Sequence, residues 1–146
     1  MNTCTRLLIL LAVVLGGCSR TGRPATAASA SRFSQLLVAE LKLLGSIEEL
    51  VNSLSGSGNV YSAHTSYVLD PEAFRADQLQ GVAIAAMKKW DEDGQYAQAG
   101  KGGGDDCFRM HYGDGRTQAF VNVLAYPYRS GRGDRTRVDI FIGVVE

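Results

Sequence analysis

The stretch "CFRMHYGDGRTQAFVNVLAY", Cys107–Tyr126, decides the fold. Large apolar side chains alternate with polar ones in its first part, so that Phe108, Met110 and Tyr112 share one face of an extended chain. Gly113–Gly115 is a turn signal, and the residues after it alternate again. The stretch therefore predicts a β-hairpin with one buried face. The opposite face then carries Cys107, Arg109 and His111.

The residues after this hairpin repeat the same alternation. In "RTRVDIFIGVV", residues 135–145, an apolar residue or threonine alternates with Arg135, Arg137 and Asp139. The preceding "PYRSGRGD", residues 127–134, contains the Gly, Ser and Pro that favour a turn. The end of the chain therefore predicts a three-stranded antiparallel meander, with one buried face and one face toward solvent or a partner.

Upstream of the meander, the apolar period changes to that of a helix. In residues 31–54, apolar side chains recur at spacings of three and four, which is typical of one buried helix face. Gly45 interrupts the pattern, and Ser46 with Glu49 forms a capping-box sequence. The segment predicts either one kinked helix or two helices that meet at Gly45. The stripe consists of Phe33, Leu37, Leu41, Leu44, Ile47, Val51 and Leu54.

Residues 59–106 predict one strand, one further helix and a loop. "NVYSAHTSYVL", residues 59–69, is rich in β-forming residues and partly alternates. Asp70 and Pro71 favour a helix start, and apolar residues at helical spacing continue to Trp90. The glycine-rich residues 94–106 are expected to be a mobile loop.

These patterns together predict an α+β fold. N-terminal helices and one central helix are expected to pack on a mostly antiparallel sheet that ends in the three-stranded meander. Residues 31–146 are long enough for one domain, because a domain of this size buries roughly two-thirds of the surface of its unfolded chain.

The first residues of the chain carry a different signal. Residues 7–15 form an apolar run after one basic residue, Arg6, and this run is too short to cross a membrane as a helix. Leu15-Gly16-Gly17-Cys18 follows, and it resembles the lipobox of bacterial lipoproteins. The resemblance implies cleavage before Cys18, diacylglycerol on its sulfur and, usually, acylation of the new N-terminus.

The resemblance also implies a location and a domain order. Ser19 follows the cysteine, whereas an aspartate there retains enteric lipoproteins in the inner membrane, so an outer-membrane anchor facing the periplasm is expected. Residues 1–17 would be the signal peptide and residues 18–30 the lipidated cysteine with a flexible tether. The tether is expected because residues 20–30 are mostly small and lack an apolar period.

Charge and cysteine content argue against nucleic-acid binding and against an internal disulfide. The chain has 15 basic and 15 acidic side chains, and loss of Arg6 with the signal leaves a formal charge of −1. This balance gives no case for nucleic-acid binding, which usually needs a basic excess. Loss of Cys4 and lipidation of Cys18 leave Cys107 as the single thiol, so no internal disulfide is expected.

The polar face of the meander is the candidate binding surface. Arginine and aromatic side chains together are typical of protein interfaces. We therefore expect a protein-binding module that has the membrane as one partner, through its lipid, and another envelope or secreted protein as the second. It would be an inhibitor or immunity protein, or an accessory subunit of an envelope or secretion assembly. The candidate residues are Arg109, His111, Arg116, Gln118, Phe120, Asn122, Arg135 and Arg137.

Two alternatives remain open. A small thiol-dependent enzyme would use Cys107 with His64 or His111, although the four-residue spacing places Cys107 and His111 about 13 Å apart along a strand. A structural lipoprotein would contact the cell wall instead. The sequence contains no G-x-S-x-G, H-E-x-x-H or S-x-x-K motif and no cysteine pair at metal-binding spacing. No catalytic residue, cofactor or metal site is therefore predicted.

Overall fold

The computed structural model describes residues 24–92 and 100–145. The described elements are α2 (Ala27–Leu44), β1 (Ile47–Ser57), β2 (Val60–Leu69), a short 3₁₀ helix (Ala76–Gln78), α3 (Leu79–Trp90), β3 (Gly100–Gly102), β4 (Cys107–Gly113), β5 (Gln118–Ser130) and β6 (Gly133–Val145). The expected α+β class is confirmed.

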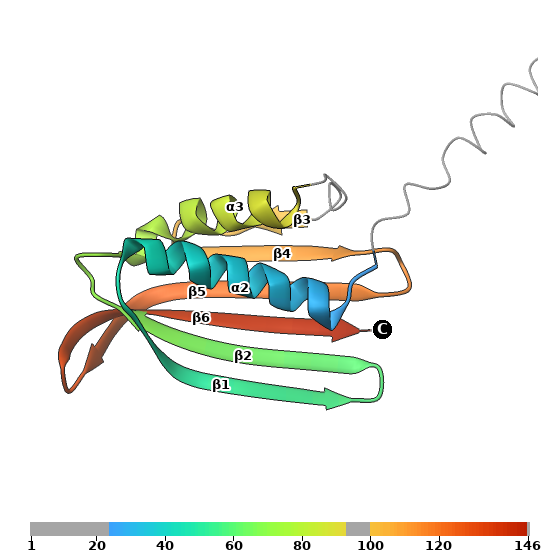
Figure 1. The fold of residues 1–146 in the computed structure, drawn as a ribbon, viewed down its shortest axis with the longest axis horizontal. Helices are drawn as coiled ribbons and strands as arrows, with labels where there is room; N and C mark the ends of the chain where they lie inside the picture. Colours follow the sequence, from blue (N-terminus) through green and yellow to red (C-terminus); the bar gives the residue numbers. More distant parts are fainter. Residues whose placement is uncertain (1–23, 93–99, 146) are drawn as a thin grey trace, which may run out of the picture.

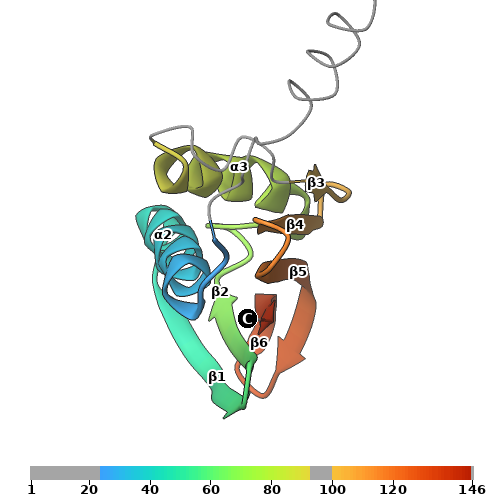
Figure 2. The ribbon, with the colours of Figure 1, turned by 90° about the vertical axis from the view of Figure 1, so that its right-hand side faces the viewer.

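The strands form one antiparallel sheet in the order β1-β2-β6-β5-β4-β3. The strands β4, β5 and β6 pair in sequence order, and β2 then pairs with the other side of β6. Both helices lie on the same face of this sheet (Figures 1 and 2). The opposite face is therefore uncovered by any described helix.

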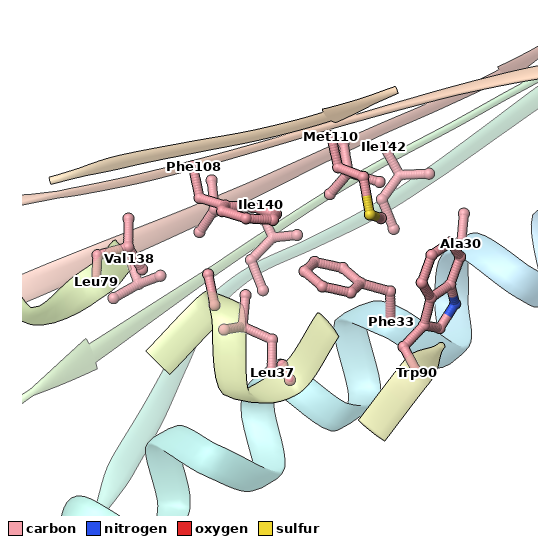
Figure 3. Packing of buried hydrophobic residues seen from close by; sticks show 14 of the residues in the cluster. Ala30, Phe33, Leu37, Leu79, Trp90, Phe108, Met110, Val138, Ile140 and Ile142 are labelled. Atoms are coloured by element: carbon pink, nitrogen blue, oxygen red, sulfur yellow. The ribbon is translucent and has the colours of Figure 1, made fainter. Parts of the chain in front are cut away.

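The core fills the space between the helices and the sheet (Figure 3). The Phe33 ring on α2 stacks on Phe108 of β4 at 5.7 Å between centroids, and it meets Trp90 of α3 edge-on at 6.0 Å. The alternation expected for the meander is confirmed, since Phe108, Met110 and Tyr112 are all buried. The buried residues of β6 are Thr136, Val138, Asp139, Ile140, Ile142 and Val144.

The first described helix, α2, begins earlier than expected. Residues 27–30, assigned to the tether, form the first turn of α2, because Thr26 and Ser29 make a reciprocal capping box. The Ser29 hydroxyl also lies 2.6 Å from the Tyr112 hydroxyl, and the Ser29 carbonyl accepts from the Trp90 indole at 2.8 Å. These contacts fix the start of α2 on the core. Residues 1–23, which include Cys18, lie outside the described residues.

The expected helix after Gly45 is wrong, because residues 47–57 form the strand β1. A ladder with β2 runs from Ile47↔Leu69 to Ser57↔Val60, and these inter-strand pairs outweigh the local capping signal at Ser46. The apolar stripe does not continue into a buried face, since Val51 is only partly buried and Leu54 is 69% exposed.

The expected helix start at Asp70 is also wrong. Asp70 follows β2 and accepts from the backbone of Glu72 with its side chain and from Phe74 with its carbonyl, which makes a single turn. The Phe74 side chain is buried, and its carbonyl accepts from the Thr136 hydroxyl at 2.7 Å. Because this contact to β6 holds the backbone at Phe74, the α-helix begins only at Leu79.

Part of the segment expected to be a mobile loop forms a strand. Residues 93–99 lie outside the described part of the chain, but Gly100–Gly102 form β3 and pair with β4. The Asp105 and Asp106 carbonyls accept from the backbone N–H of Gln80 and Ala125 at 3.1 and 2.9 Å. These bonds dock the end of the segment on α3 and β5.

Candidate functional site

The candidate site is the sheet face turned away from the helices, which we call the open face. It is built by the alternate residues of β2, β6, β5 and β4 whose neighbours along each strand enter the core. Successive rows across these strands are Ser62–Gly143–Phe120–His111, His64–Phe141–Asn122–Arg109, Ser66–Asp139–Leu124–Cys107 and Val68–Arg137–Tyr126.

Five of the sequence-predicted residues meet at one side of the open face. Arg109 pairs across the strands with Asn122, and the His111 ring stacks on Phe120 at 4.6 Å between centroids. His111 Nε2 also lies 3.3 Å from the Gln118 side-chain oxygen. The faces predicted for these two strands therefore agree with the structure.

The other three predicted arginines occupy different surroundings. Arg116 lies in the turn between β4 and β5, where Asp114 accepts from its backbone N–H, so it sits at the border of the open face. Arg135 is partly exposed and pairs in register with Tyr128. Arg137 is largely covered, with 22% of its side chain exposed, and it belongs to a polar network at the centre of the sheet.

The centre of that network is Asp139, which the sequence reading did not select as a site residue. Although it lies on the open face, Asp139 is only 4% exposed. Its carboxylate accepts from the Ser66 and Tyr126 hydroxyls, from His64 Nε2 at 3.1 Å and from Arg137 at 3.1 and 3.2 Å. Donors from three strands thus surround one buried carboxylate, and their hydrogen bonds compensate for the burial of its charge.

Arg137 connects this carboxylate to the aromatic side chains beside it. Its Nη2 donates to the Ser66 hydroxyl at 2.9 Å as well as to Asp139. Its guanidinium carbon lies 5.9 Å from the Tyr126 ring centroid and 5.6 Å from that of Tyr128. These are cation–π distances, so the network fixes the two tyrosines as well as the arginine.

The network shifts the pKa values of two of its members. Burial by itself raises the pKa of Asp139, but hydrogen bonds from Tyr126, His64 and Arg137 and the Arg137 charge outweigh it, so the pKa lies below its ordinary value of 3.8. Burial, followed by the hydrogen bond to Asp139, raises the pKa of Tyr126 above 10.0. The arrangement therefore keeps a charged carboxylate beside a neutral phenol.

The lowered pKa of Asp139 gives a pH-dependent stability. The folded pKa lies below the value in the unfolded chain, so this contribution to the free energy of unfolding is complete above about pH 5 and is lost as the pH falls through the folded pKa. We expect urea unfolding to show a larger stability difference between the parent and Asp139→Asn at pH 7 than at pH 3. An equal difference at both values would contradict the lowered pKa.

Apolar side chains surround the network on the open face. Phe120, Leu124, Tyr126 and Phe141 are 46%, 38%, 36% and 38% exposed, which is high for residues of their size. The Phe141 ring stacks on His64 at 4.3 Å between centroids. An open depression of about 450 Å³ lies beside the Phe141 ring, lined by Arg109, Asn122, Leu124 and Phe141.

The structure does not assemble the thiol–imidazole pair considered from the sequence. Cys107 is half-buried and lies in the row Cys107–Leu124–Asp139–Ser66, so β5 and β6 separate it from His64 on β2. Three strand spacings place those two backbones about 14 Å apart, and the distance to His111 along β4 is about 13 Å. Neither imidazole reaches the thiol.

Neither a metal-ligand cluster nor a membrane-crossing helix is found in the described part of the chain. Residues 24–92 and 100–145 bring no three His, Cys, Asp or Glu side chains together as metal ligands. Over the same residues, no helix combines the length and apolar content that a membrane crossing needs.

Only part of this network can be predicted from the sequence. Arg137 and Asp139 stand two residues apart on one strand face, as do His64 and Ser66. Their meeting depends on the pairing Ser66↔Asp139, which joins residues 73 apart. Comparison with known proteins adds no further assignment, since no family model, curated protein or solved structure matches the chain.

Proposed function

We propose that this chain is an outer-membrane lipoprotein, anchored through Cys18 and facing the periplasm, that acts as a protein-binding module. It would serve as an inhibitor or immunity protein, or as an accessory subunit of an envelope or secretion assembly. The observation that carries the binding role is the exposed aromatic and arginine surface of the open face. The anchor rests on the lipobox-like Leu15-Gly16-Gly17-Cys18.

The open face has the composition and the rigidity that favour protein recognition. Its apolar side chains sit beside Arg109 and Arg135, and aromatic residues with arginine supply most of the binding energy at protein interfaces. Arg137 and Tyr126 are already held by the Asp139 network. Side chains ordered before binding lose less conformational entropy when the complex forms, which raises affinity.

Gly143 offers a way to test this face without disturbing the core. It lies on β6 between Ser62 and Phe120, and a Cβ added there meets no heavy atom within 4 Å. We expect Gly143→Glu to weaken partner binding by about tenfold or more, or about 1.4 kcal/mol, because it places bulk and negative charge beside Phe120. Gly81→Glu on the exposed side of α3 is the matched control.

The experiment begins with cross-linking in detergent-solubilised envelopes, using the acylated protein and a Cys18→Ala form. The captured partner is identified, purified and titrated calorimetrically with the parent, Gly143→Glu and Gly81→Glu. Equal affinity for all three would rule out the open face. Failure of both acylated and unacylated protein to capture any partner would overturn the binding-module proposal, and co-sedimentation with isolated cell wall would then favour a structural lipoprotein.

A further inference from the structure

The strand β1 forms one edge of the sheet, and it is not protected as the other edge is. The opposite edge strand, β3, has only three residues, whereas β1 has eleven and pairs along one side with β2. Most of its residues are exposed. Such an edge presents unpaired N–H and C=O groups to any further strand.

The two halves of β1 differ in how they resist pairing. The first half carries Glu48 and Glu49 and a β-bulge between Glu49 and Val51, and both features discourage an added strand. The second half, Val51–Ser57, has no charge, no proline and no break in register. Leu54 lies at its middle and is 69% exposed.

We propose that residues 51–57 of two copies of this chain pair antiparallel about a two-fold axis at Leu54, which joins two sheets edge to edge. In this register Leu54 lies opposite Leu54 of the second copy, and Ser53 lies opposite Ser55. Residues directly opposite in an antiparallel pair have Cβ atoms about 5 Å apart, so the two leucines cover one another from water.

The main-chain groups of β1 suit this register. Ser57 and Val60 flank the two-residue turn that starts at Gly58, and in such hairpins the flanking residues exchange both main-chain hydrogen bonds. Because the direction of these groups alternates along a strand, even-numbered residues of this half face the open edge. The edge-facing groups are those of Asn52, Leu54 and Gly56, which give about six hydrogen bonds across the axis.

Symmetry is the reason to choose a second copy over an unrelated strand. The uncharged segment is centred on its one leucine, which is exposed, and a two-fold pairing places such a central residue opposite itself. Glu48 and Glu49 then extend past the partner's turn at Gly58, so no like charges oppose each other across the axis.

Variants with one introduced cysteine test the register directly. In a Cys107→Ser background, Leu54→Cys places two thiols opposite each other, and mild oxidation is expected to give a disulfide-linked dimer. Asn52→Cys is the matched control, since its Cα atoms would stand about 14 Å apart across the axis, beyond the roughly 7 Å that a disulfide spans. The Cys107→Ser parent measures cross-linking through the remaining cysteines.

Sedimentation of the full chain in detergent tests the association itself. We expect the parent to dimerise with increasing concentration, Leu54→Lys to remain monomeric, and Leu43→Lys to behave as the parent. Leu43 is the matched control because it is 76% exposed on α2. A monomeric parent, or Asn52→Cys that cross-links as fast as Leu54→Cys, would overturn the proposal.

Discussion

Phe33→Ala is expected to lower the free energy of unfolding by about 3–5 kcal/mol, the usual range for truncating a buried phenylalanine. Phe33 is fully buried, and its ring contacts Phe108 on β4 and Trp90 on α3. The substitution therefore leaves a cavity at the point where both helices meet the sheet (Figure 3). Urea unfolding at neutral pH measures the loss.

Two further variants keep this prediction testable if Phe33→Ala does not fold. Phe33→Leu preserves part of the ring volume and is expected to show a smaller loss, because the residual cavity is smaller. Leu43→Ala removes an exposed leucine from the same helix and is expected to change stability by less than about 0.5 kcal/mol. If Phe33→Ala lost no more stability than Leu43→Ala, the core would not depend on the Phe33 ring.

The contacts of Phe33 also show which parts of the fold the sequence predicts well. The faces of β4, β5 and β6 follow directly from alternation, because each strand has one face in the core and one exposed, and turns join them in sequence order. The buried stripes of α2 and α3 follow from helical spacing for the same reason. Local pattern and tertiary environment agree in these segments.

The failures occur where a distant contact decides the structure. Residues 47–54 continue a helical stripe after a capping signal at Ser46, yet their pairing with β2 makes them a strand with Leu54 exposed. Asp70 and Pro71 favour a helix start, but the Thr136 hydroxyl holds the Phe74 carbonyl in a turn. Neither partner can be read from the local sequence, since each lies on another strand.

The open face was predicted as a surface but not as a network. Alternation alone places Arg109, His111 and Phe120 on it. The environment of Asp139 can be known only from the β2–β6 register, which brings His64 and Ser66 to its carboxylate. From the local sequence alone, Asp139 would be predicted to be an exposed strand residue. The network also makes Arg137 unsuitable as a binding probe, because Arg137→Glu would set two carboxylates together.

Asp139→Ala is expected to lower the free energy of unfolding by about 3 kcal/mol, which is toward the lower end for breaking a buried ion pair. The loss leaves the largely covered Arg137 guanidinium without its carboxylate and removes the acceptor of the Tyr126 and Ser66 hydroxyls. Thermal unfolding is expected to shift down by about 10 °C. A shift below about 2 °C would mean that solvent replaces these hydrogen bonds without loss.

A double-mutant cycle separates the charge pair from the rest of the network. Arg137→Met added to Asp139→Ala removes the uncompensated cation, so the combined loss is expected to be at least about 1 kcal/mol smaller than the sum of the single losses. Strictly additive losses of stability would contradict an energetic coupling between Arg137 and Asp139, whose side chains are in contact. The double variant also lacks the guanidinium that lies over Tyr126 and Tyr128. If the open face binds a partner through these ordered rings, affinity must therefore fall in the double variant even where its stability is largely recovered.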